Sequence, residues 1–313
     1  MRVVTSGAPY LDIDGYAGIL AFAELLRARG EDAVAASTSI LNETVPSILR
    51  QENHYFQAGY KPTPFDTFTI IDVSDPAYFD KMVAIDRVDE IIDHHLGFEH
   101  IWAMRPNVQT DIEFIGAAAT QIYQRWLESG LLPKISQSSA KLLACGILDN
   151  TLNLGAELTT SADHSAYLQL AKIAGLDSTW PEHYFSSCEQ AILTDIPAAI
   201  LNDSKVLSFK TFHRPLSIGQ LVVWDADPIL KAHQNTMQVQ LTTRKPDWFM
   251  NLISLKDRKS IFVAPQPEVK AWLSKLLQVK FIGASATAGR PWLRKEMVKK
   301  DLYTAAAVKK VAD

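Results

Sequence analysis

Aspartate side chains that can bind cations follow two short apolar segments in the first part of the chain. Asp12 and Asp14 flank a single apolar residue just before a predicted helix, and Asp72 and Asp75 follow a strand-like run. Carboxylates in such loops are suitable ligands for divalent cations. Each pair, taken alone, is also typical of a helix cap or a turn, because aspartate accepts backbone hydrogen bonds at those positions.

A denser group of polar side chains stands at residues 93–95. Asp93, His94 and His95 follow directly on the strand-like residues 90–92. Three consecutive side chains that can bind a metal ion or a phosphate are less easily explained by packing than a single aspartate. This tripeptide is therefore the most specific chemical signal in the first half.

A further carboxylate, Asp149, ends an apolar, helix-like run that includes residues 145–148. The C-terminus of a helix disfavours an anion, so this side chain needs a compensating partner, and a cation would serve. Oxygen and imidazole ligands without thiolates suit Mn²⁺, Mg²⁺ or Co²⁺ better than structural Zn²⁺. Two such ions roughly 3.5 to 4 Å apart could stabilise an in-line displacement at phosphorus.

These residues need a scaffold, and the hydrophobic pattern of the first half predicts alternating strands and helices. In a parallel α/β sheet the carboxyl ends of the strands meet at one edge, where functional residues gather. Because the acidic residues follow predicted strands, we expect them at that edge. The predicted strands are residues 3–6, 33–36, 67–71 and 90–92, and the predicted helices are residues 16–29, 116–128 and 138–147.

The length of the chain favours two domains. Its 313 residues, of which 47% are hydrophobic and 21% are charged, are more than one core usually organises. Residues 176–189, with the string DSTWP, predict a flexible linker. We expect an α/β fold with an N-terminal parallel-sheet domain over residues 1–178, a smaller α/β domain over residues 190–313, and an active site between them.

Charge is unevenly divided between the two halves. Residues 1–189 contain 12 Lys+Arg and 25 Asp+Glu, a net of −13, and residues 190–313 contain 19 and 10, a net of +9, which together give −4. An acidic half can hold divalent cations while a basic half holds an anion. The division favours a polyanionic substrate, although a chance segregation of solvated charges would give the same pattern.

The sequence shows no sign of membrane insertion or secretion. No run approaches the roughly 18 consecutive apolar residues of a spanning helix, and the first residues lead into a strand without a signal-peptide core. Cys145 and Cys188 lie far apart without a CxxC spacing, which argues against a disulfide framework or a thiolate zinc site. We expect a soluble, cytoplasmic protein with reduced cysteines.

The four N-terminal motifs, in this order, resemble those of the DHH phosphoesterase superfamily, whose name-giving motif would be Asp93-His94-His95. The second half is similar to the DHHA2 domain of family II inorganic pyrophosphatases and of the exopolyphosphatase/prune group, so the resemblance covers nearly the whole chain. The other similar segments are residues 113–120, 146–154, 158–160, 209–212, 218–220, 249–257 and 293–298.

The resemblance implies metal ligands in the first half. Asp72 would bridge two metal ions. Asp14, His94 and Asp149 would complete one of the two sites, and Asp12 would serve the other. Mn²⁺ is the expected cofactor, with Mg²⁺ or Co²⁺ as alternatives.

The resemblance also implies residues that contact the substrate. His95 would face the substrate phosphate, so that Asp72 and His95 are the expected catalytic residues. Lys210, Arg294 and Lys295 would bind the phosphates, which suits the guanidinium fork of arginine and the compact charge of lysine. An ordinary exposed basic face is the alternative for these three.

One position departs from the pyrophosphatase pattern. Those enzymes carry a metal-binding histidine four residues before the first aspartate of the Asp-x-Asp loop, and Ala8 stands there. Exopolyphosphatase-like relatives also lack that histidine. Leu293 replaces the serine that precedes the Arg-Lys pair in pyrophosphatases. These differences favour a shifted substrate or a weaker first metal site, for which Asp75 is one candidate to compensate.

The leading expectation is a metal-dependent hydrolase of phosphoanhydride bonds in short polyphosphate or pyrophosphate. The first alternative is a phosphodiesterase acting on small nucleotides. The chain contains no Gly-Gly pair, which such relatives use in a different C-terminal domain, and it lacks an aromatic and basic stripe for single-stranded nucleic acid. The second alternative is a non-catalytic phosphate-binding or interaction protein. The expected partner is a small phosphorylated substrate, and a homodimer is left open.

Overall fold

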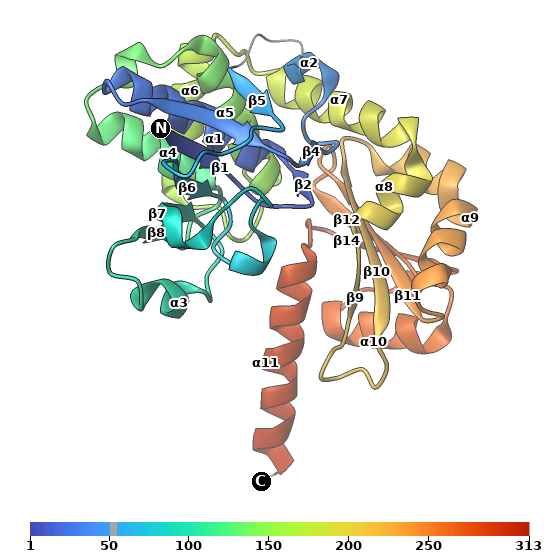
Figure 1. Cartoon of the computed structure of the whole chain (residues 1–313). Coiled ribbons are helices and arrows are strands. Elements are labelled where there is room, and N and C mark those ends of the chain that lie inside the picture. The colour runs from blue at the N-terminus through green and yellow to red at the C-terminus, as the bar shows by residue number, and fades with distance from the viewer. Residues whose placement is uncertain (51–54, 313) are drawn as a thin grey trace. The chain divides into compact units, whose positions relative to one another are not determined.

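The structure is a computed structural model that describes residues 1–50 and 55–312. Contacts divide the chain into two compact units, Met1–Ser187 and Cys188–Asp313. Each unit is built on its own six-stranded sheet (Figure 1). Within the described residues, no helix is both long and apolar enough to cross a membrane.

The first unit contains a parallel sheet with the strand order β5-β3-β1-β6-β7-β8, as the alternation of strands and helices predicted. Because β1, β6 and β7 are neighbours and run in the same direction, their carboxyl ends lie side by side. A short parallel pair, β2 with β4, lies outside this sheet. The strands are β1 (Arg2–Thr5), β2 (Tyr10–Leu11), β3 (Ala33–Ser37), β4 (Ile40–Leu41), β5 (Phe56–Ala58), β6 (Thr67–Ile71), β7 (Val88–Asp93) and β8 (Gln109–Ile112).

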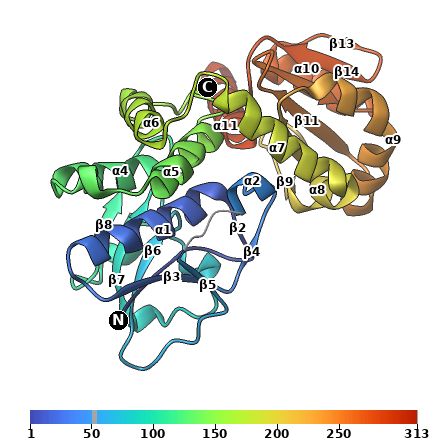
Figure 2. The same ribbon diagram turned by 90° about the horizontal axis from the view of Figure 1, so that it is seen from above.

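Helices cover both faces of this sheet because its strands present apolar side chains on both sides. Phe68 and Ile70 of β6 join a buried cluster with Trp102 of α3, whereas Ile71 faces α1. Gly18 lies at that contact, and a Cβ there would come within 2.5 Å of Ile71 Cγ2. Figure 2 shows α1, α4 and α5 together on one face. The helices are α1 (Ile13–Ala28), α2 (Ser47–Arg50), α3 (Glu99–Ala103), α4 (Ala118–Glu128), α5 (Gln137–Asn150) and α6 (Ser161–Ala174).

The predicted flexible linker over residues 176–189 is wrong for most of its length, because residues from Trp180 onward form helix α7 (Trp180–Thr194). Tyr184, Phe185, Cys188 and Ile192 are buried along it. Their spacing of about one helical turn gives α7 an apolar stripe that can be buried only if the segment is helical. The division between the two units falls inside this helix.

The second unit is a mixed α/β layer with the strand order β13-β14-β12-β11-β10-β9, in which β10 and β11 are parallel and the other pairs are antiparallel. Phe249 of β11 packs with Trp272 of α10 on one face, and Met250 packs with α8 and α9 on the other. The elements are α8 (Ile196–Asn202), β9 (Ser204–Leu207), β10 (Leu216–Val223), α9 (Ala226–Arg244), β11 (Trp248–Ser254), β12 (Lys259–Val263), α10 (Pro267–Leu277), β13 (Phe281–Ile282), β14 (Ser285–Ala288) and α11 (Arg294–Ala312).

Candidate metal centre

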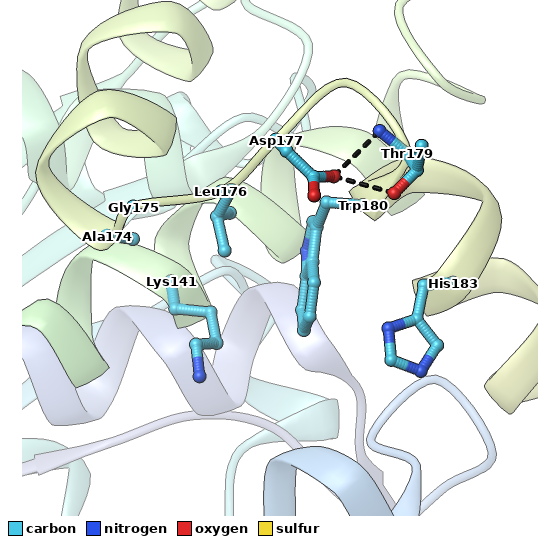
Figure 3. Close-up of a pocket in the computed structure, with 8 residues that line it drawn as sticks. All are labelled: Lys141, Ala174, Gly175, Leu176, Asp177, Thr179, Trp180 and His183. Atoms are coloured by element: carbon cyan, nitrogen blue, oxygen red, sulfur yellow. Dashed lines mark hydrogen bonds between the residues drawn. The ribbon is translucent and has the colours of Figure 1, made fainter.

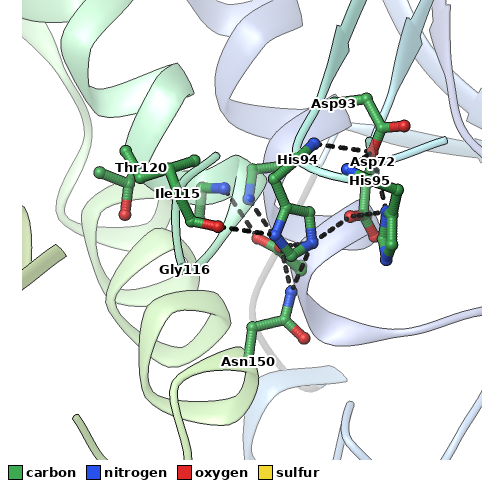
Figure 4. A network of polar contacts seen from close by, with 12 residues as sticks. Asp72, Asp93, His94, His95, Ile115, Gly116, Thr120 and Asn150 are labelled. Carbon is green, nitrogen blue, oxygen red and sulfur yellow. Dashed lines mark hydrogen bonds and ion pairs between the residues drawn. The ribbon is translucent and has the colours of Figure 1, made fainter. Parts of the chain in front are cut away.

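Polar side chains meet at the carboxyl ends of the neighbouring strands β6 and β7. Asp72 directly follows β6, and His94 and His95 directly follow Asp93 at the end of β7. Nitrogen or oxygen atoms of Asp72, His94 and His95 all lie within 4.8 Å of one another. His94 Nε2 lies 3.3 Å from Asp72 Oδ1, and His95 Nδ1 lies 3.9 Å from the same oxygen (Figure 4). The edge of the sheet therefore gathers a carboxylate and two imidazoles.

Asp72 has a backbone conformation that aims its carboxylate into this group. Its φ of 65° is left-handed, which aspartate tolerates better than most residues. Its N–H donates to the carbonyl of Ile92 in the adjacent strand at 2.8 Å. Oδ1 is buried and accepts no hydrogen bond from any described residue. Burial, and then the charges of Asp14 and Asp12, raise the pKa of Asp72 well above its ordinary value, so a cation beside Oδ1 would relieve a real electrostatic cost.

Asp14 is a second buried carboxylate, and it lies beside this group. It lies in the first turn of α1 and is 0% exposed. Its oxygens accept the backbone N–H groups of Ala118 at 2.8 Å and Ala119 at 2.7 Å, at the N-terminus of α4, where an anion is favoured. Oδ2 lies 3.8 Å from His94 Nε2. Burial raises the pKa of Asp14, the charge of His94 opposes that shift, and the charge of Asp12 adds to it.

The ring of His94 is oriented by a backbone carbonyl. Its Nδ1 lies 3.1 Å from the carbonyl oxygen of Ile115, so this nitrogen carries the hydrogen that is donated. Nε2 is the other ring nitrogen, and it is the one that faces Asp14 and Asp72. A histidine held in this way by its other ring nitrogen is the usual arrangement for a metal ligand.

Asp93 organises the loop that carries both histidines. Its Oδ1 accepts the backbone N–H of His94 at 2.8 Å and of His95 at 3.1 Å, and it lies 2.8 Å from His95 Nδ1. Burial opposes ionisation, but the hydrogen bond and charge of His95 outweigh it and lower the pKa of Asp93. The side chain of His95 remains 54% exposed. Asp93 therefore holds the backbone and the Nδ1 side of His95, while the rest of the ring faces solvent.

The structure brings Asn150, the residue after the predicted Asp149, into contact with this group. The Asn150 amide nitrogen donates to Asp14 Oδ2 and lies 3.4 Å from His94 Nε2 (Figure 4). Asp149 Oδ1 instead lies 3.3 Å from the hydroxyl oxygen of Tyr184. The two residues are consecutive at the end of α5, where one step rotates the side chain by about 100° around the helix axis.

The other predicted positions near the centre are occupied by local contacts. Asp12 caps α1 by accepting the N–H of Gly15 at 3.0 Å, and its charge still acts on Asp14 and Asp72. Asp75 accepts the N–H of Ala77 at 3.0 Å and caps the short helix Pro76–Tyr78. Among the described residues, the group of potential ligand atoms that all lie within 4.8 Å of one another contains Asp72, His94 and His95, and Asp12, Asp14 and Asp75 lie outside it.

Sequence reasoning gave no role to Asp163, which supports the site from α6. This buried carboxylate accepts the N–H of Gly116 at 3.0 Å and the hydroxyl of Thr120 at 2.6 Å, and so braces the loop whose Ile115 carbonyl orients His94. It also completes a capping box with Thr160. The pattern Thr-x-x-Asp at residues 160–163 was the signal for the cap, but the contact with Gly116 bridges 47 residues and has no local signature.

The basic residues predicted to bind phosphate lie in the second unit. The Arg294 guanidinium donates to the backbone and the carboxylate of Asp203, and its side chain is 11% exposed. Lys210 and Lys295 are exposed. Of the three predicted phosphate-binding residues, the two lysines are thus exposed, and the arginine contacts Asp203 within its own unit.

A separate cavity of about 260 Å³ lies where α7 begins (Figure 3). Asp177 accepts the N–H and hydroxyl of Thr179 at 2.8 and 2.6 Å, and Lys141 Nζ lies 5.6 Å from the ring centroid of Trp180. None of the predicted site residues lines it. Its lining is Lys141, Ala174, Gly175, Leu176, Asp177, Thr179, Trp180 and His183.

Fold and site together define an α/β protein with a carboxylate and imidazole centre at the edge of a parallel sheet, followed by a unit with a mixed sheet. The donor set fits a divalent cation of the Mn²⁺ or Mg²⁺ type, because it combines carboxylates and imidazole with no thiolate. The observation that supports this fit is the buried Oδ1 of Asp72, which accepts no hydrogen bond from any described residue.

Comparison with known proteins agrees with this class. No family model matches the sequence. Over 181 residues the chain is 26% identical to a probable manganese-dependent inorganic pyrophosphatase of Streptococcus mutans. This match covers 56% of the chain and 56% of that protein, so the chain spans about half the length of the curated relative.

Solved structures show the same fold over nearly the whole chain. A candidate family II inorganic pyrophosphatase of Methanococcus jannaschii matches with a TM-score of 0.64 at 18% identity, over 97% of this chain and 99% of that one. An exopolyphosphatase-related protein of Bacteroides fragilis matches with a TM-score of 0.51 at 12% identity, over 99% and 93%. These likenesses confirm the expected fold class.

Proposed function

We propose that the protein is a metal-dependent phosphohydrolase that cleaves the phosphoanhydride bond of pyrophosphate or short polyphosphate, with Mn²⁺ as the preferred cofactor. The observation that carries the proposal is the convergence of Asp14 and Asp72 on His94, together with an Asp72 Oδ1 that is buried and accepts no hydrogen bond from any described residue. The pyrophosphatase relative and the two matching folds support the reaction class.

Asp14, Asp72 and His94 would hold the cation, with Asp12 as a candidate ligand of a second one. When bound, a divalent cation lowers the pKa of water and neutralises charge on phosphate oxygens. The protein contributes the geometry. Asp93 and the Ile115 carbonyl hold the two imidazoles in place, and burial keeps Asp14 and Asp72 in a medium where their attraction for a cation is strong.

His95 is suited to the substrate because its ring is held and yet exposed. Asp93 Oδ1 accepts the hydrogen bond from His95 Nδ1. The other ring nitrogen of His95, Nε2, is not part of this bond. A positively charged imidazole there would donate a hydrogen bond to a phosphate oxygen. We therefore propose that His95 binds the substrate and that Asp72 is the central acidic residue of catalysis.

We further propose that the substrate phosphates are bound by Lys210, Lys295 and Arg294, and hence that the active site uses both units. The net charge of +9 over residues 190–313 supports this assignment. Lys210 and Lys295 are the stronger candidates because they are exposed. Arg294 would have to exchange its contact with Asp203 for the phosphate.

The proposal is tested by measuring phosphate release from pyrophosphate, tripolyphosphate, a nucleoside triphosphate and a cyclic dinucleotide, each with Mn²⁺ and with Mg²⁺. We expect hydrolysis of pyrophosphate or tripolyphosphate that depends on Mn²⁺. Asp72→Asn should lower kcat by about 10²- to 10³-fold, because it removes charge from the centre of the site. Asp75→Asn is the matched control, since Asp75 caps a neighbouring short helix.

Two results would favour the alternatives. Hydrolysis confined to the cyclic dinucleotide would favour a phosphodiesterase. Tight phosphate binding without turnover of any of the four compounds would favour a non-catalytic binding protein. Equal loss of activity in Asp72→Asn and Asp75→Asn would show that the site around Asp72 is not the one that carries the reaction.

A further inference from the structure

Asn150 is the last residue of α5, and the turn that follows has an unusual backbone conformation. Leu152, Asn153 and Leu154 in this turn have φ values of 51°, 56° and 59°. Such a run of left-handed residues other than glycine is disfavoured and persists only where surrounding contacts impose it. The N–H of Asn153 donates to the Leu148 carbonyl at 2.8 Å. The strained turn therefore ends α5 with Asn150 held in a defined place.

The amide of Asn150 occupies the position between two groups that would share a cation. Its nitrogen donates to Asp14 Oδ2 and lies 3.4 Å from His94 Nε2. Those two atoms are 3.8 Å apart. His94 Nδ1 contacts the Ile115 carbonyl, so Nε2 is the ring nitrogen that faces the Asn150 amide. An NH₂ group there offers its hydrogens to a carboxylate beside an imidazole nitrogen, as a positive ion would.

The Asn150 side chain also contains an amide oxygen, which can bind a metal ion. Rotation of the amide by half a turn about its last bond exchanges nitrogen for oxygen at nearly the same place. Amide oxygens are neutral ligands of hard divalent cations. An oxygen placed next to Asp14 Oδ2 would be repelled by it unless a cation stood between them.

We infer that Asn150 is a residue that sets the metal affinity of this centre: its amide N–H groups hold Asp14 in the metal-free protein, and its amide oxygen becomes a charge-neutral ligand when a divalent cation binds. This inference rests on the proposed metal-dependent function. It assigns to Asn150 the place that the sequence pattern gave to Asp149. The centre then holds its cation with two buried carboxylates, one imidazole and one amide.

The test is calorimetric titration of Mn²⁺ into the metal-stripped full chain, without substrate. Asn150→Asp adds a negative ligand and should lower the Kd of the tighter site roughly tenfold or more, because affinity follows ligand charge. Asn150→Leu, of similar size without an oxygen, should raise that Kd by a similar factor. Asp149→Asn should leave it within about twofold, since affinity depends on the ligands themselves.

Asn153→Asp is the matched control for charge alone, because Asn153 lies three residues further on in the same turn. If Asn150→Asp and Asn153→Asp lower the Kd for Mn²⁺ equally, the effect comes from any added negative charge near the site, and the assignment of Asn150 is wrong. It is also wrong if Asn150→Leu binds as the wild type does, or if Asp149→Asn weakens binding as much as Asn150→Leu.

Thermal unfolding gives a second readout that does not depend on Asn150→Leu folding well. In Asn150→Asp the new carboxylate faces Asp14, so the metal-free protein should melt below the wild type, and the rise in Tm on adding Mn²⁺ should exceed that of the wild type. An unchanged rise overturns the inference. Pyrophosphate hydrolysis by the wild type with an unchanged Kd in Asn150→Asp would overturn the role of Asn150 alone. Absence of any Mn²⁺ binding by the wild type would overturn the proposed function as well.

Discussion

Nδ1 of His95 lies 2.8 Å from Oδ1 of Asp93, the same carboxylate oxygen that accepts the backbone N–H of His95. One oxygen thus holds the ring and the backbone of a single residue. This relationship leaves the rest of the ring exposed to solvent. It makes Asp93 a positioning residue whose removal should affect substrate contacts more than the fold.

Asp93→Asn should lower kcat for pyrophosphate by about 10- to 100-fold, as loss of a residue that orients a histidine typically does. The amide oxygen still accepts hydrogen bonds but removes the negative charge beside the His95 ring. Phosphate release should therefore slow, while the Kd for Mn²⁺ measured by calorimetry changes little. Asp89→Asn, a change of the same type in β7, is the control, and an equal effect in both variants would contradict the role of Asp93.

Ala8 permits a prediction about the number of metal ions. With no imidazole at position 8, the wild type should show one tight and one weak or silent Mn²⁺ site by calorimetry. Ala8→His should strengthen the second site by roughly an order of magnitude if the loop presents position 8 to the metals. Ala77→His adds the same group to an exposed position in a nearby turn and should not strengthen it. Two sites of equal affinity in the wild type would show that another residue already supplies the ligand.

Gly116→Ala should destabilise the protein by about 1–3 kcal/mol, because a Cβ forced into a packed site displaces its neighbours. The added carbon would lie 2.6 Å from Asp163 Oδ2 and 2.7 Å from Thr151 Cγ2. Urea unfolding measures the change in the free energy of unfolding. At Gly289 a Cβ meets nothing within 4 Å, so Gly289→Ala should stay within about 0.5 kcal/mol. Equal stability of the two variants would refute the tight contact at Gly116.

The raised pKa of Tyr167 leads us to expect a lower free energy of unfolding at alkaline pH. Burial, with a smaller contribution from the charge of Cys145, raises the pKa of Tyr167 from 10.0 to about 12. Between these values the unfolded chain releases the phenol proton and the folded chain keeps it. The unfolded state then binds fewer protons, so the free energy of unfolding falls as the pH rises above 10. Tyr167→Phe should reduce this slope, as followed by urea unfolding from pH 9 to pH 11, and an unchanged slope would contradict the shift.

Much of the first unit could be predicted because its signals are local. The strand at residues 67–71 was predicted with the bounds that the structure shows, since β-branched and aromatic residues there are bounded by polar turns. The placement of Asp72 and His94 followed from the rule that parallel strands end at one edge. That rule needs only the order of strands and helices.

Other features depend on information that a local pattern lacks. Asp149 and Asn150 are adjacent, and only the phase of the last turn of α5 decides which of them faces Asp14. The engagement of Arg294 by Asp203 joins residues 91 positions apart. The linker prediction is wrong because the DSTWP string is also compatible with the start of a helix: Pro181 stands in the first turn of α7, where proline is tolerated.

Helix α7 has a consequence for dissecting the chain into fragments. Tyr184, within its first half, donates its hydroxyl to the Thr44 carbonyl at 2.9 Å and lies near Asp149, so residues beyond 178 complete the packing beside α5. A fragment ending at residue 178 would expose the surface that Tyr184 and Phe185 now cover. A fragment ending near Ser187 would keep that cover but cut the helix between turns. Neither half is therefore expected to fold well alone, because α7 contributes buried residues on both sides of the division.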